Sequence, residues 1–483
     1  MRWQMIFKIV GALISCTGLC MAAPLACALY YGDASTTPLL ISMLVALGVG
    51  LALYLLCKNT NPGMGINHRE GLAVTTLGWV AAGITGALPF YLAGMLPSAT
   101  DCLFESLSGF TTTGSSVLID IEAVDRGLLF WRSMTHFLGG MGIIVLTLAI
   151  LPFLGVGGMQ LYKAEVPGPS PDKLKPRIKD TAATLWKVYL LFSLLQTLLL
   201  LLGGMDLFDS LCHTFATMAT GGFSTRNASI GHYQSAYIDW VVTIFMLIAS
   251  INFSLHYFML KGRAKVMFKD PEFRLFAAIY LAFTLIVAVN VFGRVYETAE
   301  PSVRQAAFQV ASILSTTGFA TANFELWPPL SQCVLILAMF IGGCAGSTSG
   351  GMKCMRIQVL GRHSYKEIFR LVHPRAVIGV KLGGRVVSPE IISAMWGFVT
   401  LWLGVTCLST LVLSACDLDV LTAFTAVLSC IGNVGPGLGS VGPAENFAHL
   451  PVVAKWCLMM CMLLGRLEVY TVVALFIPEF YRK

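Results

Sequence analysis

The sequence predicts an all-α polytopic membrane protein with four pseudo-symmetric repeats around a central pore. Hydrophobic residues make up 56% of the 483 residues and charged residues 12%, which is about half the charged fraction of a soluble domain. Ten segments are apolar and long enough to cross a bilayer. Four short stretches, each built around one glycine, recur about a hundred residues apart along the chain.

The spanning segments are predicted by length, because a helix needs roughly 20 apolar residues to cross the hydrocarbon core. They are residues 4–31, 37–57, 71–97, 128–156, 181–204, 235–260, 272–293, 329–352, 390–415 and 452–478. The first contains the signal-like stretch MAAPLACA, but its apolar run is longer than a signal core and predicts an uncleaved helix. Four shorter apolar segments precede the glycine stretches, at 103–113, 208–220, 305–316 and 420–432. They are too short to cross the membrane and are typical of re-entrant half-helices.

The glycine stretches read GFTTTGSS, ATGGFSTR, STTGFATA and GNVGPGLG, and they align on one glycine each. The anchors are Gly114, Gly222, Gly318 and Gly435. Six residues before the anchors the side chains are small: Ser108, Ala216, Ser312 and Ser429. Four residues before them they are large and apolar: Phe110, Met218, Leu314 and Ile431. Four turns in register indicate a fourfold pseudo-symmetric object, whereas one alone would indicate only a small-residue helix break.

Non-helical backbone inside a membrane must be buried or line an aqueous path. Successive carbonyl groups in such turns can replace the hydration shell of a cation, and glycine allows the positive φ that turns them to one side. The C-terminal end of each half-helix, partly negative, also favours a cation. The candidate filter residues are Thr112, Thr113, Gly114, Thr220, Gly221, Gly222, Thr316, Thr317, Gly318, Asn433, Val434 and Gly435. Threonine hydroxyls in the first three turns are candidate additional ligands.

The net charge of +7 reflects orientation in the membrane, because lysine and arginine gather in the loops after even-numbered spans. The longest such loop holds Lys353, Arg356, Arg362, Lys366, Arg370, Arg375, Lys381 and Arg385. Both termini are also basic. We therefore expect cytoplasmic N- and C-termini, and the charge does not indicate nucleic-acid binding. The 14 cysteines show no spacing with histidine or carboxylates that predicts a metal site.

Several long motifs resemble the potassium-translocating subunits of the Trk/Ktr/HKT superfamily, in particular the bacterial TrkH/TrkG type. They are the four glycine stretches, GGMGIIVLTLAILP at 139–152, GGMQLYKAEVPGP at 157–169, FIGGCAGSTSGGMK at 340–353, LVHPRAV at 371–377 and GRLEVYT at 465–471. The resemblance covers essentially the whole chain. It implies four membrane–pore-loop–membrane repeats preceded by two extra transmembrane helices, in a bacterial inner membrane. The corresponding divisions are 1–60 for the two helices, then repeats at 61–170, 171–265, 266–387 and 388–483. The fourth turn departs from the family's T-T-G-F pattern, which leaves open whether it binds the ion equally.

Two features of the spans fit a gate. The eighth span is interrupted by GGCAGSTSGG, which predicts a break in the helix because glycine destabilises helices. The resemblance implies an intramembrane gating loop, made of Gly342, Gly343, Gly346, Ser347, Thr348, Ser349, Gly350 and Gly351; the alternative is a kink that allows close packing. Arg466 lies within the last span, where a lone arginine is costly. The resemblance makes it a pore-lining charge beside the gate, and the alternative is an ion pair with Glu468 or Glu105.

We therefore predict potassium uptake through a selective, gated pore, with K⁺ as the bound ion and no organic cofactor in this chain. A proton- or sodium-coupled symporter is the alternative, and no catalytic motif suggests an enzyme. The resemblance implies a homodimer regulated by a cytosolic nucleotide-binding ring. The chain itself has no nucleotide-binding pattern, so the nucleotide-binding ring would be a separate subunit. We expect it to dock on the cytoplasmic loops 157–180 and 353–389. Anionic membrane lipid is a second explanation for the basic loop.

Overall fold

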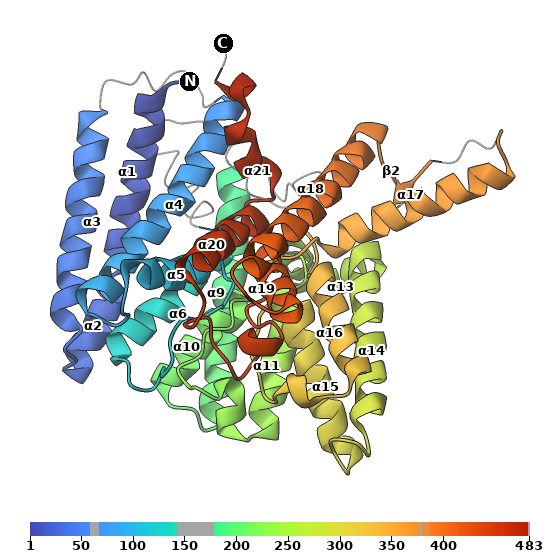
Figure 1. Ribbon diagram of the computed structural model, residues 1–483, viewed down its shortest axis with the longest axis horizontal. Coiled ribbons are helices and arrows are strands. Elements are labelled where there is room, and N and C mark those ends of the chain that lie inside the picture. The colour runs from blue at the N-terminus through green and yellow to red at the C-terminus, as the bar shows by residue number, and fades with distance from the viewer. Residues whose placement is uncertain (58–66, 143–177, 376–378, 384, 482–483) are drawn as a thin grey trace.

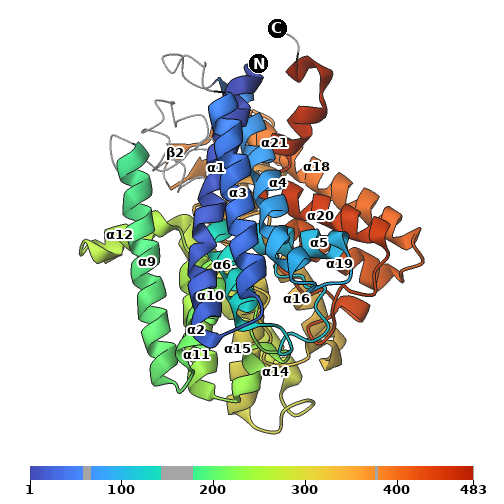
Figure 2. The same ribbon diagram turned by 90° about the vertical axis from the view of Figure 1, so that its left-hand side faces the viewer.

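The computed structural model describes residues 1–57, 67–142, 178–375, 379–383 and 385–481, and nearly all of its regular structure is helical. Figure 1 shows both termini at the same end of the molecule, which agrees with an even number of crossings. The first three helices are α1 (Trp3–Cys20), α2 (Ala22–Tyr31) and α3 (Thr36–Leu56). Helices α1 and α3 pack closely because Gly11 has no side chain. A Cβ atom at Gly11 would lie only 2.8 Å from the Gly50 carbonyl oxygen. Figure 2 shows this pair beside α4 (His68–Leu92).

After these helices, one order recurs four times: a long helix, a short helix that ends in a glycine turn, and a further helix. The first set is α4, α5 (Ala99–Phe110) and α6 (Arg126–Gly140), and the second is α9 (Ile178–Leu202), α10 (Leu207–Met218), α11 (Ala236–Ala249) and α12 (Phe253–Leu260). The third is α14 (Pro271–Val291), α15 (Ala299–Leu314) and α16 (Pro329–Ile341), and the fourth is α18 (Pro389–Ser414), α19 (Val420–Gly432), α20 (Val452–Arg466) and α21 (Tyr470–Val473). Helix α13 (Ala264–Lys269) connects the second and third sets.

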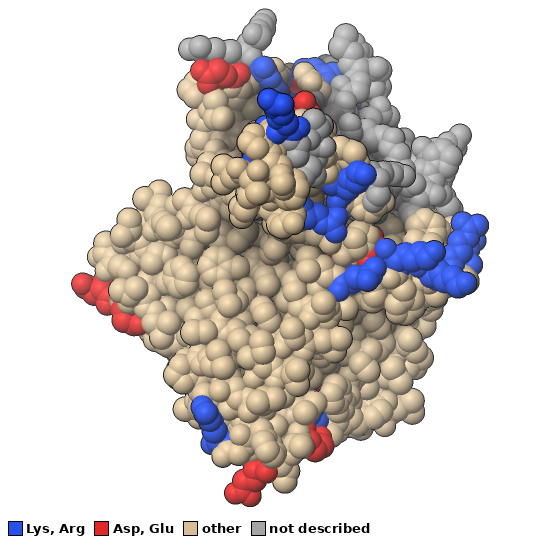
Figure 3. All heavy atoms as spheres, turned by 90° about the vertical axis from the view of Figure 1, so that its right-hand side faces the viewer, with Lys and Arg blue, Asp and Glu red and all other residues tan. Residues whose placement is uncertain are grey.

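The prediction of a helical membrane protein is confirmed. Six of the described helices are long and apolar enough to cross a membrane, and they match the predicted spans 4–31, 37–57, 71–97, 181–204, 272–293 and 390–415. Of the predicted span 128–156, residues 143–156 lie outside the described residues, as do residues 157–177 of the predicted docking loop. Figure 3 shows a broad uncharged band on one face, with most of its lysine and arginine above that band.

Three predicted spans are not continuous helices. The segment 235–260 bends by 103° between α11 and α12, and 452–478 bends by 110° after α20. Asn252 caps the restarted helix, because its side-chain oxygen accepts a 2.8 Å hydrogen bond from the Ser254 nitrogen. The segment 329–352 is helical only to Ile341.

The predicted basic loop 353–389 is also largely helical. Helix α17 (Cys354–Val372) projects away from the body, and a hairpin of β1 (Lys381–Leu382) and β2 (Arg385–Val386) lies beside it (Figure 1). The basic and apolar residues of α17 alternate with a helical period, and the prediction of a loop overlooked this pattern. The four short helices match the predicted half-helices, although they end before the glycine turns. Serine or aspartate caps the starts of α5, α10 and α19, at Ser98, Asp206 and Asp419.

Candidate functional site

The four glycine turns have one backbone conformation in common. Two residues before each anchor glycine, a residue other than glycine lies in the left-handed region: Thr112 (φ 53°), Thr220 (55°), Thr316 (59°) and Asn433 (53°). The anchors follow with φ of 83° at Gly114, 81° at Gly222, 82° at Gly318 and 104° at Gly435. Such a conformation costs on the order of 1–3 kcal/mol for a residue with a side chain, and it persists only where the surroundings enforce it.

Hydrogen bonds to the preceding short helix enforce this conformation. The nitrogen of the residue before each anchor donates to the carbonyl six residues before the anchor: Thr113 to Ser108 (2.9 Å), and Gly221 to Ala216, Thr317 to Ser312 and Val434 to Ser429 (each 2.8 Å). The serine hydroxyls add a second bond of 2.6 Å to a turn carbonyl: Ser108 to Ser115, Ser312 to Phe319 and Ser429 to Gly435. Ala216 has no hydroxyl, so the second turn lacks this bond.

The four turns face one another in a closed ring. A Cβ atom built on each anchor glycine would meet the backbone oxygen of the residue before the next anchor: Gly221 for Gly114, Thr317 for Gly222, Val434 for Gly318 and, at 2.9 Å, Thr113 for Gly435. The last contact returns to the first turn. Glycine is therefore required at all four anchors for steric reasons as well as for φ. The structure thus brings the twelve predicted filter residues together.

The threonine hydroxyls differ in their surroundings. Those of Thr113 and Thr317 hydrogen-bond at 2.7 Å within their own turns, to Thr111 and Ser315. The buried Thr112 hydroxyl has no hydrogen-bond partner among the described residues. Backbone oxygens, rather than most of these hydroxyls, are therefore the groups available to a cation.

The segment 342–353, between α16 and α17, lies against the turns and contains all the predicted loop residues: Gly342, Gly343, Gly346, Ser347, Thr348, Ser349, Gly350 and Gly351. The Thr348 hydroxyl donates to the Met218 carbonyl at the end of α10, at 3.0 Å. The Gly350 nitrogen donates to the Thr316 hydroxyl at 2.7 Å. A Cβ atom on Gly350 would also meet the Gly432 carbonyl oxygen. One segment thus contacts the end of the second short helix and the third and fourth turns.

Both ends of this segment are fixed to neighbouring helices. The Cys344 nitrogen donates to the Ser250 carbonyl at 2.9 Å, at the bend between α11 and α12. The buried Glu272 carboxylate accepts from the nitrogens of Ala345 (2.7 Å) and Met355 (2.9 Å). The bend in the sixth span therefore exposes backbone groups that hold the segment.

Arg466, at the end of α20, joins the segment to the first repeat. Its guanidinium donates to the Thr348 carbonyl at 2.8 Å and to the carbonyls of Gly139 and Gly140 at 2.6 and 3.0 Å. The two carboxylates that the sequence offered as ion-pair partners have other arginines beside them. Glu105 pairs with Arg132 at 2.6 Å, and Glu468 pairs with Arg356 at 2.5 Å.

A second column of supporting residues, nine before the anchors, was missed in the sequence. Its members are polar and buried in three repeats, and each contacts its own turn two to four residues after the anchor. Glu105 accepts from the Val117 nitrogen (2.9 Å), His213 bonds the Ser224 hydroxyl (2.9 Å), and the Gln309 amide faces the Thr321 and Ala322 nitrogens (2.9 and 3.2 Å). We call these side chains the braces. The recurring polar residue in a helix of small and apolar residues was the available signal.

The fourth repeat has the same brace one residue earlier. Ala426 occupies the column, but the neighbouring Thr425 hydroxyl both donates to the Leu438 carbonyl and accepts from its nitrogen, each at 3.0 Å. The short helices are thus tied to both sides of the turns they precede.

Beyond the turns, a loop after the first turn meets a loop after the second. The Asn227 amide donates to the Asp120 carboxylate at 2.9 Å, and its oxygen accepts from the Ile121 nitrogen at 2.8 Å. The first of these bonds lowers the pKa of Asp120. Asp120 therefore keeps its negative charge in the loop that follows the first turn. The described residues contain no group of three or more histidine, cysteine or carboxylate side chains that could hold a metal.

Comparison with known proteins agrees with this architecture. A family model described as "TrkH: Cation transport protein" matches residues 39–481. The chain belongs to the TrkH family of cation transport proteins. The Trk system potassium uptake protein TrkH of Escherichia coli K12 is 44% identical over 489 residues, with full coverage of both chains. TrkG of the same strain is 35% identical over 482 residues, covering 99% of each chain.

A solved structure has the same fold. The crystal structure of the potassium transporter TrkH from Vibrio parahaemolyticus superposes with a TM-score of 0.90 at 38% identity, covering all of both chains. This TrkH-family chain is therefore a multi-pass membrane protein that transports cations, and it is not an enzyme.

Proposed function

We propose that this protein takes up potassium across a bacterial inner membrane through a selective pore. The observation that carries the proposal is the closed ring of four glycine turns, in which each anchor glycine faces the backbone oxygen of the next turn. Carbonyl rings of this kind replace the hydration shell of potassium. The relatives named as potassium uptake proteins, at 34–44% identity, support the choice of ion.

The electrostatics of the ring also favour a cation. All four short helices point their C-terminal ends at the turns, and these ends carry partial negative charge. The twelve filter residues include no charged side chain. The fourth turn supplies carbonyls in the same conformation as the other three, so we propose that it takes part in binding.

The segment 342–353 and Arg466 together form the proposed gate. The segment is hydrogen-bonded to the end of α10 and to the third turn, and Arg466 places a positive charge beside it. A positive charge in a low-dielectric path opposes the passage of a cation. Opening would require the segment to leave its contacts with the turns.

Regulation is proposed to come from outside the membrane. The exposed basic side chains of Arg370, Arg375 and Lys381 offer a docking surface for a cytosolic nucleotide-binding ring, with the chain acting as a homodimer and both termini cytoplasmic. Helix α17 begins directly after the proposed gate. A regulator bound to this surface would therefore act on the gate through one helix.

A coupled symporter is the second candidate, because the bends at α11–α12 and α20–α21 make discontinuous helices of the kind found in carriers. Current reversal potentials in proteoliposomes distinguish the two. A pore gives a reversal potential that follows the potassium gradient alone. A reversal potential that also shifts with an imposed pH or sodium gradient would replace the pore with a symporter.

A further inference from the structure

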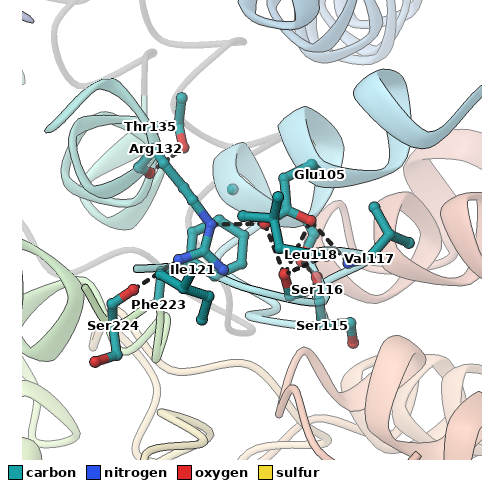
Figure 4. Close-up of polar contacts among 12 residues, drawn as sticks. Glu105, Ser115, Ser116, Val117, Leu118, Ile121, Arg132, Thr135, Phe223 and Ser224 are labelled. Atoms are coloured by element: carbon teal, nitrogen blue, oxygen red, sulfur yellow. Dashed lines mark hydrogen bonds and ion pairs between the residues drawn. The ribbon is translucent and has the colours of Figure 1, made fainter. Parts of the chain in front are cut away.

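The brace of the first repeat differs from the others because it is charged and paired. Glu105 and Arg132 are 0% and 2% exposed, and the Arg132 Nε lies 2.6 Å from the Glu105 carboxylate. Figure 4 shows the two side chains directed toward each other from α5 and α6. No other brace in the described part of the chain carries a charge, since the remaining three are His213, Gln309 and Thr425.

Each member of the pair is attached to a different turn. Glu105 accepts hydrogen bonds of 2.9 Å from the Ser116 hydroxyl and the Val117 nitrogen, just after the first anchor glycine. Arg132 donates to the Ser224 carbonyl at 2.9 Å, just after the second anchor, and its guanidinium lies 3.5 Å from the centre of the Phe223 ring. The pair is therefore a rigid link between the first and second turns.

A buried ion pair is a poor source of stability, because the cost of removing two charges from water offsets their attraction. Apolar side chains of the same volume would hold α5 against α6 at least as well. They would not hold the two turns at a set distance, whereas the planar guanidinium has donors in a fixed geometry. The arrangement thus favours a role in geometry over one in stability.

We propose that Glu105 and Arg132 are positioning residues that set the spacing of the first and second filter turns and so the preference for potassium over sodium. This inference rests on the proposed function of the turns as a filter. Neither side chain contacts the ion. Both act through the carbonyls of the turns that they join.

The most informative variant is Arg132→Lys. A lysine keeps the buried charge pair with Glu105, but its single ammonium group cannot also make the planar contacts with Ser224 and Phe223. We expect a folded protein whose preference for potassium over sodium falls about tenfold, the lower end of the effect of supporting residues around bound ions. Glu105→Gln should lower the preference in the same direction, and it keeps an acceptor for the Val117 nitrogen.

A matched control is the pair of Lys455 and Asp101, which also involves α5. Its Nζ–Oδ1 distance is 2.6 Å, and its side chains are 7% and 10% exposed. It ties the start of α5 to α20, and within the described part of the chain neither side chain hydrogen-bonds a glycine turn. The double variant Asp101→Asn with Lys455→Met should change the melting temperature without changing ion preference.

Competition between potassium and sodium is measured in proteoliposomes. Melting temperature and the yield of monodisperse protein are measured for each variant, and Gly318→Ser is included as a reference. If Gly318→Ser loses its preference for potassium over sodium but Arg132→Lys keeps it, the positioning role is wrong and the filter stands. If neither changes the preference, the filter proposal itself fails. An equal loss of preference in the Lys455 and Asp101 control would reduce the Glu105–Arg132 pair to general stability.

Discussion

The backbone nitrogen of Gly350 donates a 2.7 Å hydrogen bond to the hydroxyl of Thr316, and both groups are buried. Thr316 is the third-turn residue with positive φ, and Gly350 belongs to the segment 342–353. The proposed filter and the proposed gate are therefore in direct contact. A change in one can alter the other without an intervening element.

Thr316→Val should weaken closure. Valine has a similar shape but no acceptor, so the buried Gly350 nitrogen loses its partner at a cost of about 1–3 kcal/mol. We expect a higher potassium leak from proteoliposomes in the absence of a regulator. Thr243→Val is the control, because that buried hydroxyl bonds only a carbonyl of its own helix, at 2.7 Å. An unchanged leak in Thr316→Val would mean that this bond does not hold the segment closed.

Gly318→Ser should lower the preference for potassium over sodium. A Cβ atom there would meet the Val434 carbonyl oxygen, and φ is 82°. The added side chain would displace a carbonyl of the proposed filter. Competitive uptake measures the effect, with Gly361→Ser as the control because a Cβ on Gly361 meets nothing within 4 Å. Unchanged uptake and discrimination in Gly318→Ser would remove the turns from consideration as the filter.

Gly350→Ala should open the pore more readily than the wild type. The new methyl group would meet the Gly432 carbonyl oxygen and lie 2.9 Å from the Asn433 Cβ. The segment must then move away from the fourth turn. Single-channel recording gives the open probability, and Gly361→Ala is the matched control in α17. Normal closed-state leak, here or after partial deletion of 342–351, would contradict a plugging role.

Arg466→Gln should raise the rate of potassium passage. Glutamine can still donate to the Thr348 carbonyl, but it removes the positive charge. A tenfold increase would correspond to about 1.4 kcal/mol less barrier. Arg466→Lys keeps the charge and should stay close to the wild-type rate. If both variants raise the rate above that of the wild type by the same factor, the contacts of Arg466 matter and its charge does not. If neither variant changes the rate, Arg466 has no part in the barrier.

Charge reversal at Arg370, Arg375 and Lys381 should weaken docking of the cytosolic regulator. All three side chains are exposed on or beside α17. Co-purification from detergent measures docking, and reversal of the exposed Arg294, between α14 and α15, is the control. Wild-type recovery of the regulator would leave lipid binding as the role of this surface.

Much of the fold could be predicted from the sequence because its determinants are local. A run of apolar residues is visible without any partner, and six of the spans match for this reason. The glycine turns were also visible, because each requires a small residue six before the anchor and a residue with positive φ at the anchor itself. The same comparison of columns could have found the braces Glu105, His213 and Gln309, whose polar character recurs at one position.

The tertiary structure decided what depends on contact between distant segments. Hydropathy did not reveal the bends after Ala249 and Arg466, since apolar residues resume on both sides of the few polar residues at each bend. At the bend, the Ser250 carbonyl accepts a hydrogen bond from the Cys344 nitrogen, almost a hundred residues later, and so joins two segments far apart in the chain. The sequence also left undecided whether Glu105 pairs with Arg132 or with Arg466. Each buried charge had several possible partners, and only their positions in space select one. The sequence by itself determined which segments enter the membrane and where the chain turns; the packing of those segments determined which turns face each other and which charges meet.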